Sequence, residues 1–272
     1  MQGRLSPIVG GRIQAFPWDH WRDEFRAAQN LGLRLMEWTL DQQRLCENPL
    51  LTGDGQTEIH ALCARHDVAI PSLTGDCFMQ APFWKLEGTE RAKLTDDFRF
   101  VAESCAAIGI SIIVVPLVDN GRVENSAQED LIVQHLTGLA GFLSGDGLRI
   151  AFESDYSPAE LSRFIERFDP RLFGVNYDMG NSAALGFDVD EELDRYGHRI
   201  TNVHVKDRMR GGTTVPLGTG NVDFQRVFAG LRRIQFRGNF ILQTARAADG
   251  DDAGALTRYQ RMTTEWLSSN GS

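Results

Sequence analysis

Short apolar runs rich in β-branched residues recur along this chain, and each is followed by a longer segment of helical periodicity. This alternation is the sequence signal of βα units joined in a parallel sheet. Seven of these runs lie near residues 32–38, 67–76, 110–117, 148–153, 172–178, 199–207 and 237–244. A barrel needs an eighth strand, which must come from MQGRL at residues 1–5 or from GRIQAF at residues 11–16.

The intervening segments carry the caps and apolar spacing of helices. Ser157 and Glu160 form a capping-box pattern, with a proline at the first helical position between them. Segment 89–109 is long, has apolar residues at helical spacing and ends on a glycine. These features predict helices between successive strands.

Eight such units could close into a barrel or lie open as a doubly wound sheet. The open class carries phosphate loops, but no GxGxxG follows the first strand and no GxxxxGK[ST] is present. The length of 272 residues also suits one barrel, since barrels of about 250 residues are ordinary. We therefore predict a single (β/α)₈ TIM barrel spanning residues 1–272.

Composition narrows the choice of partners. The formal net charge of −9 gives no general electrostatic help in binding a polyanion, so nucleic acid is disfavoured. No apolar run approaches the roughly 20 residues needed to cross a bilayer. The first residues lack the apolar core of a signal peptide, and the four cysteines form no CxxC pair. We expect a cytoplasmic protein with reduced thiols and a small-molecule partner, and leave homo-oligomerisation open.

Four predicted strands end in polar residues that packing does not require, namely Glu153, Asp178, His204 and Gln243. Parallel strands end at one face of a barrel, so these side chains are expected to converge at its mouth. Such a mixed oxygen and nitrogen site suits Mn²⁺ or Mg²⁺, with Co²⁺ or Zn²⁺ as alternatives. Taken singly, Glu153 or Asp178 could instead cap a helix, and His204 could be a satisfied interior histidine.

Several segments carry a family resemblance: AFES at 151–154, NYDMGN at 176–181, NVHVKD at 202–207, PLGTGNVDF at 216–224 and FILQ at 240–243. They resemble the sugar phosphate isomerase/epimerase family of xylose-isomerase-like barrels. The resemblance covers most of the chain. It implies a divalent metal held at the barrel mouth by a Glu, an Asp, a His and a second Glu. By position these correspond to Glu153, Asp178, His204 and Gln243.

The chain departs from that family pattern at two positions. Gln243 stands where the family usually has Glu, and Asn181 stands where many members carry a His. A glutamine still offers a carbonyl oxygen to a metal, but it cannot act as a general base. In the 3-epimerases that resemble this chain, two metal-bound glutamates take and return a proton on opposite faces of the substrate. With Gln243 in place of the second glutamate, this two-base mechanism is in doubt here. Isomerisation through an enediolate, or a dehydratase reaction, needs only one carboxylate, and Glu153 is the candidate base.

Further candidates surround the expected mouth. Lys206 would neutralise an oxyanion or a phosphate, or would pair with Asp207. The candidate substrate-binding residues are Glu37, Asp76, Trp84, Asn181, Asp207, Arg208 and Arg210. For Glu37 a surface or capping role is the alternative, and for both arginines a solvated loop. Phe78, Phe83 and Trp84 read as exposed aromatics that cover a sugar or support a dimer contact.

Two competing functions remain at this stage. An endonuclease acting at abasic sites would need a histidine-rich trinuclear zinc centre, whereas only His204 falls at a predicted strand end. A non-catalytic sugar-binding relative that lost its metal is the other alternative, and Gln243 and Asn181 are the residues that favour it. The prediction is a metal-dependent carbohydrate isomerase or epimerase, with a dehydratase on the same scaffold as its nearest alternative.

Overall fold

A parallel sheet of seven strands forms the centre of the computed structural model, which describes residues 1–268. The strands follow one another around the sheet in sequence order, as the βα pattern predicts. They are β1 (Leu35–Thr39), β2 (Ala69–Thr74), β3 (Ile112–Leu117), β4 (Arg149–Ser154), β5 (Phe173–Asp178), β6 (Ile200–Val205) and β9 (Asn239–Leu242). A separate antiparallel hairpin consists of β7 (Asp207–Arg208) and β8 (Thr214–Val215).

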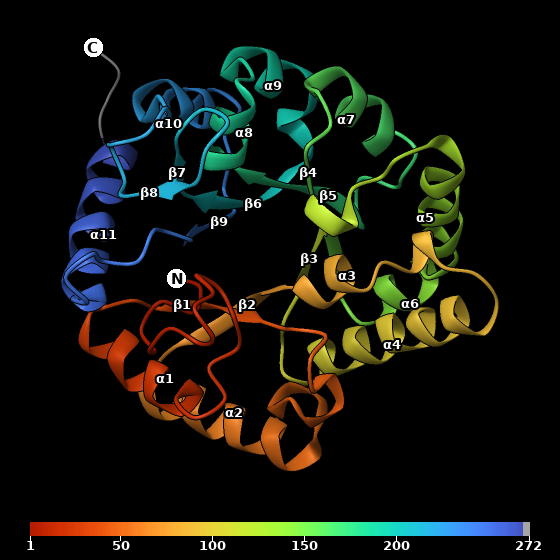
Figure 1. Cartoon of the computed structure of the whole chain (residues 1–272), viewed down its shortest axis with the longest axis horizontal. Coiled ribbons are helices and arrows are strands. Elements are labelled where there is room, and N and C mark those ends of the chain that lie inside the picture. Colours follow the sequence, from red (N-terminus) through yellow and green to blue (C-terminus); the bar gives the residue numbers. More distant parts are fainter. Residues whose placement is uncertain (269–272) are drawn as a thin grey trace.

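Helices encircle these strands (Figure 1). They are α1 (Trp21–Asn30), α2 (Gly53–His66), α3 (Asp76–Gln80), α4 (Gly88–Ala107), α5 (Ser126–Gly138), α6 (Ala140–Gly145), α7 (Pro158–Ile165), α8 (Met179–Leu185), α9 (Val189–Tyr196), α10 (Phe224–Arg233) and α11 (Asp252–Ser268). The capping box predicted at α7 is present, with Ser157 and Glu160 bonded reciprocally. Within residues 1–268, none of the helices has the length and apolar character that a membrane span requires.

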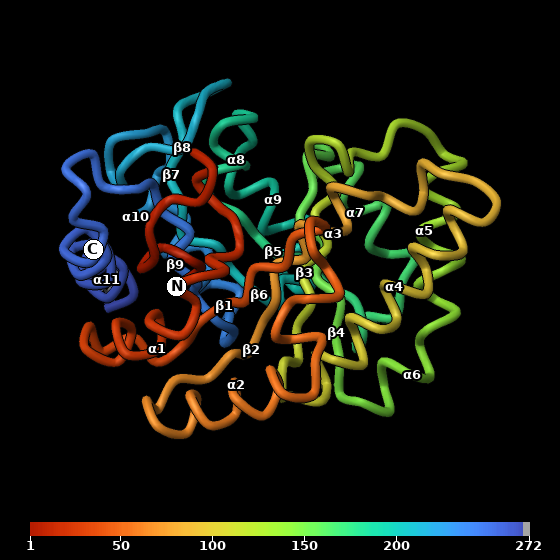
Figure 2. The backbone as a smooth tube through the Cα atoms, turned by 60° about the horizontal axis from the view of Figure 1, so that its bottom comes forward, coloured from red at the N-terminus to blue at the C-terminus, as the bar shows by residue number. Residues whose placement is uncertain are grey.

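Residues 1–2 close the barrel between its first and last strands. Gln2 forms a parallel bridge with Glu37 of β1, and the Gln2 amide donates to the Leu242 carbonyl at 3.1 Å. The Glu37 amide in turn donates to the Met1 carbonyl at 2.9 Å. Of the two predicted sources for the eighth strand, MQGRL is therefore the one that closes the barrel, although it contributes only a bridge. Figure 2 shows the resulting proximity of the first and last units, α1 in red and α11 in blue.

The outer faces of the strands pack against the helices through aromatic clusters. Phe152 of β4 lies with its ring centroid 5.1 Å from that of Phe164 in α7. Phe228 of α10 stacks on Phe240 of β9 at 5.6 Å. Burying such side chains contributes on the order of 2 kcal/mol each, so these contacts fix the helices on the barrel wall.

The loop after β2 buries the aromatics that were predicted to be exposed. Phe78 contacts Phe98 of α4 at a centroid distance of 4.5 Å, and Phe83 lies edge-on to Trp84 at 5.1 Å. Trp84 is only 2% exposed. The prediction of an exposed aromatic lid was therefore wrong, because α4 supplies an apolar surface that these rings cover. Trp84 has no free face to offer a sugar in this structure.

Candidate active site

Three neighbouring strands bring Glu153, Asp178 and His204 together at the barrel mouth. Glu153 lies in β4, Asp178 ends β5, and His204 of β6 is directly opposite Asp178 in the sheet register. One ligand atom from each residue lies within 4.8 Å of the others, and all three residues are buried. His204 Nδ1 is 3.2 Å from Glu153 Oε2 and 3.7 Å from Asp178 Oδ2. The convergence expected from the spacing of the strands is present.

Glu37 holds the far side of the histidine ring. Its Oε1 lies 2.7 Å from His204 Nε2, and neither side chain is exposed to solvent. Hydroxyls of β2 and the amide of Asn202 also donate to the Glu37 carboxylate. A carboxylate behind a histidine fixes the orientation of the ring and raises the basicity of its other nitrogen. Glu37 therefore directs Nδ1 toward Glu153 and Asp178, and neither of the roles weighed against substrate contact, surface or capping, applies.

His204 and Glu37 shift each other's pKa. Burial opposes a charge on His204, but the Glu37 carboxylate and those of Asp178 and Glu153 outweigh it and raise the pKa of the imidazole well above its ordinary value. For Glu37, burial alone would raise the pKa, yet His204 and the two β2 hydroxyls lower it to about 2. The proton and a metal ion would compete for Nδ1, since a ligating histidine must be unprotonated at the ligating atom.

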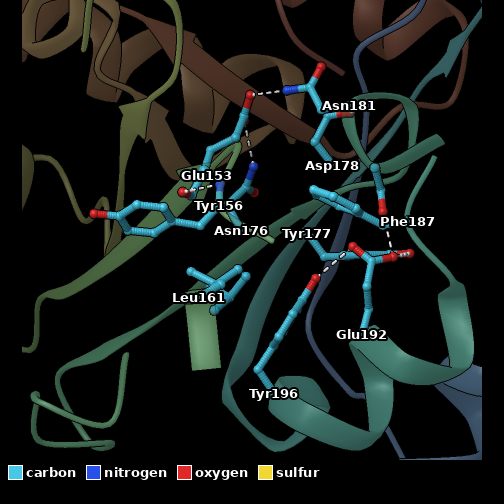
Figure 3. A pocket seen from close by; sticks show the side chains of 13 residues that line it. Glu153, Tyr156, Leu161, Asn176, Tyr177, Asp178, Asn181, Phe187, Glu192 and Tyr196 are labelled. Atoms are coloured by element: carbon cyan, nitrogen blue, oxygen red, sulfur yellow. Dashed lines mark hydrogen bonds between the residues drawn. The ribbon is translucent and has the colours of Figure 1, made fainter. Parts of the chain in front are cut away.

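Two asparagines hold the Glu153 carboxylate. Asn176 donates to Oε2 at 2.9 Å and Asn181 donates to Oε1 at 2.7 Å (Figure 3). Asn181 is a predicted site residue, whereas Asn176 was missed. Strand periodicity could have found Asn176, because it lies two residues before Asp178 and so faces the same side of β5.

Asp178 caps a helix and also faces the other candidate residues. Its Oδ1 accepts a hydrogen bond from the backbone N–H of Asn181 at 2.8 Å and so caps α8. Its Oδ2 faces His204 and also lies 3.1 Å from Lys206 Nζ. The cap orients the carboxylate and directs its other oxygen into the site.

Lys206 and Gln243 meet because β6 and β9 are paired. The register sets Val205 beside Leu242, and each strand is followed by the polar residue of interest. Lys206 Nζ donates to Gln243 Oε1 at 2.9 Å. The predicted pairing of Lys206 with Asp207 is replaced by its contact with Asp178.

Asp207 organises a loop of the main chain. Its buried carboxylate accepts from the amides of Gly218, Gly220 and Val222 at 2.9, 2.8 and 3.2 Å. A Cβ at Gly220 would lie 2.2 Å from Asp207 Oδ1, so only glycine fits there. The Asp207 and LGTGNVDF segments are thus joined as one structural unit.

The remaining candidates lie at different distances from the carboxylates. Arg208 Nη1 donates to Asn181 Oδ1 at 2.8 Å and so borders the site. The guanidinium of Arg210 lies against Gly186 and lines a separate cavity with Arg226.

Asp76 begins α3 rather than ending a strand, and it accepts from Gln14 at 2.7 Å. Burial raises the pKa of Asp76 to about 7, although the Gln14 hydrogen bond opposes this.

The donor set fits a divalent cation. Two carboxylates, an imidazole nitrogen directed by a third carboxylate (Glu37), and the amide oxygen of Gln243 are ligands that Mn²⁺, Mg²⁺ and Co²⁺ accept. The Lys206 ammonium lies among the same oxygens, on Asp178 and Gln243. Any metal bound here therefore meets a cation that belongs to the chain.

A closed parallel barrel with polar side chains at the carboxyl ends of its strands defines a TIM-barrel protein with its site at the mouth. The model of the xylose isomerase-like TIM barrel family matches residues 25–264. The chain belongs to this family.

Two proteins illustrate what this chain is similar to in sequence. An inosose dehydratase of Geobacillus kaustophilus is 33% identical over 128 residues, which span only 40% of either chain. A putative L-ribulose-5-phosphate 3-epimerase, SgbU, of Haemophilus influenzae is 23% identical over 82% of this chain and 83% of that protein.

Solved structures share the fold at low identity. A D-psicose 3-epimerase crystallised in the presence of D-fructose has a TM-score of 0.74 and 13% identity, covering 93% of this chain and 98% of the other. An IOLI protein with a zinc atom has a TM-score of 0.71 and 15% identity, covering 93% and 94%.

Proposed function

We propose that this chain is a carbohydrate isomerase or epimerase that requires a divalent metal and moves a proton beside a carbonyl group through an enediolate. The convergence of Glu153, Asp178 and His204 at the barrel mouth carries the proposal. The names of its relatives support it, because they include sugar epimerases and an inosose dehydratase.

The proposed metal ligands are Glu153, Asp178 and His204, with Gln243 as a fourth, weaker donor. When bound, a divalent metal supplies polarisation of the substrate carbonyl and stabilisation of negative charge on its oxygens. Glu37 keeps the His204 ring in place for this role.

Glu153 is the proposed base. Asn176 and Asn181 each donate to one of its oxygens, which fixes the plane of the carboxylate and leaves its remaining lone pairs available. The Lys206 ammonium, 3.1 Å from Asp178, is placed to neutralise charge that develops on the substrate.

The amide at position 243 favours a reaction that needs one base over a reaction that needs two. An amide cannot accept and return a proton as a carboxylate does, so a two-base epimerisation lacks its second base here. Aldose–ketose isomerisation needs one base that moves the proton between adjacent carbons. We therefore place isomerisation first and a dehydratase reaction second.

Solvent deuterium incorporation tests the proposal. The Mn²⁺-loaded protein is incubated in D₂O with a panel of ketoses, aldoses and cyclic polyols, and the exchanging carbon is located by NMR. We expect exchange at a carbon beside the carbonyl, and a rate at least 100-fold lower for Glu153→Gln, since general bases contribute about 10²–10⁴-fold. Glu58→Gln, on the surface beside Arg22, is the control and should keep the wild-type rate. Equal exchange by wild type and Glu153→Gln would remove Glu153 from the mechanism.

A further inference from the structure

The Lys206 ammonium lies inside the candidate metal site. Its Nζ lies 3.1 Å from Asp178 Oδ2, 2.9 Å from Gln243 Oε1 and 3.3 Å from Asn181 Oδ1. Two of these three oxygens belong to the proposed metal donors. The side chain is only 15% exposed, so solvent screens this charge weakly.

The four proposed metal donors carry little negative charge, and Lys206 offsets part of it. Of the four donors, only Glu153 and Asp178 are carboxylates, because position 243 is a glutamine. One ammonium offsets one of these two charges. Because Lys206 contacts Asp178 directly, the compensation falls on an oxygen that a metal would need.

We propose that Lys206 is an internal cation that competes with the divalent metal for the oxygens of Asp178 and Gln243. The inference rests on the metal site of the proposed function and adds a residue that limits its affinity. Metal binding requires Nζ to leave these two oxygens, and binding tightens when the charge at position 206 is removed. Asn181 Oδ1, to which Nζ already donates, is an acceptor that the displaced ammonium keeps.

Arg208 offers a matched cation for comparison. Its Nη1 also donates to Asn181 Oδ1, at 2.8 Å, while its other hydrogen bonds go to the Gly212 carbonyl. It therefore borders the same asparagine without bonding to Asp178 or Gln243. Removing its charge changes the electrostatic field at the mouth but frees no metal donor.

Calorimetric titration with Mn²⁺ at one pH and one ionic strength tests the competition. We expect Lys206→Met and Lys206→Gln to bind Mn²⁺ at least tenfold more tightly than wild type, which is about 1.4 kcal/mol. Lys206→Arg, which keeps the charge, and Arg208→Met should each stay within threefold of wild type. Thermal melting of each metal-free variant checks that the barrel is folded.

Three results would overturn the inference. Unchanged or weaker binding by both neutral variants of Lys206 would show that its ammonium does not oppose the metal, while the metal site itself would stand. Equal tightening in Lys206→Arg or Arg208→Met would show that side-chain shape or general charge, not competition at these oxygens, sets the affinity. Absence of Mn²⁺ binding in wild type and in all folded variants would remove the competition and the metal-dependent function together.

Discussion

At the residue scale, the buried carboxyl of Asp76 lowers the stability of the fold at neutral pH. The carboxyl is buried and has Gln14 as its hydrogen-bond donor, while Asp41 and Glu153 add negative charge around it. Its pKa rises from 3.8 to about 7, chiefly through burial. A group with a raised acid pKa binds its proton more tightly in the folded state, so stability falls as pH rises from about 4 to about 7.

The substitution Asp76→Asn should therefore stabilise the protein at high pH. We expect the free energy of unfolding at pH 8 to increase by about 2 kcal/mol, and the difference to vanish near pH 3, below the ordinary pKa of 3.8, where the carboxyl is protonated in both states. Urea unfolding at the two pH values measures this. Asp96→Asn, at an exposed position of α4, is the control and should change little at either pH. A variant less stable than wild type at pH 8 would mean that the ionised carboxyl stabilises the fold.

Individual residues also show where sequence patterns stop. The spacing of polar strand ends predicted that Glu153, Asp178 and His204 converge, and they do, because the alternation of βα units fixes which residues reach one face. The same patterns could not place Trp84, because its short turn, Phe83–Lys85, packs against α4, a helix that follows it in the chain. Asp178 shows that capping and site roles are compatible, because a carboxylate has two oxygens.

At the scale of elements, one carboxylate joins two helices. Glu129 of α5 accepts from Arg163 of α7 at 2.7 and 2.8 Å, and from Arg167 at 2.6 Å. Tyr156 OH donates to it as well, at 3.1 Å. The hydrogen bonds from Arg163, then those from Arg167 and Tyr156, lower the pKa of Glu129 to about 2 although burial opposes them.

Glu129→Gln should loosen this junction. A lowered acid pKa stabilises the folded state above the ordinary pKa of 4.5, and this stabilisation is lost as pH falls toward 2. We expect a loss of about 2 kcal/mol at pH 7, after allowance for the exposed arginines, and a much smaller loss at pH 2.5. Chemical unfolding at both pH values measures it, with Glu103→Gln as the control, since its surface pair with Arg99 contributes little. An equal loss at both pH values would assign the effect to packing instead of charge.

Element boundaries were predictable to different degrees. The capping box at Ser157 placed the start of α7 from four residues, because the signal is local. The eighth strand was not decidable from sequence, because Met1 and Gln2 acquire their extended pairing only from the edges of β1 and β9. A two-residue bridge carries too little periodicity to be recognised.

For the whole molecule, closure of the barrel is what assembles the site. Glu37 of the first strand reaches His204 of β6 across 167 residues of chain, with 2.7 Å between the bonded atoms. Gln243 of the last unit meets Lys206 by register with β6. The βα alternation predicted the scaffold and the convergence of Glu153, Asp178 and His204, but these cross-barrel partners depend on geometry that only the closed sheet defines.

We propose that Glu153, Asp178 and His204 hold a divalent metal at the mouth of this barrel. Crystals soaked in Mn²⁺, with diffraction data collected at a wavelength where manganese scatters anomalously, test it most directly. We predict one strong anomalous peak within bonding distance of Glu153, Asp178 and His204 Nδ1, with Lys206 Nζ moved off Asp178. A map without a peak at these three residues, with Lys206 still bonded to Asp178 and Gln243, would contradict the account.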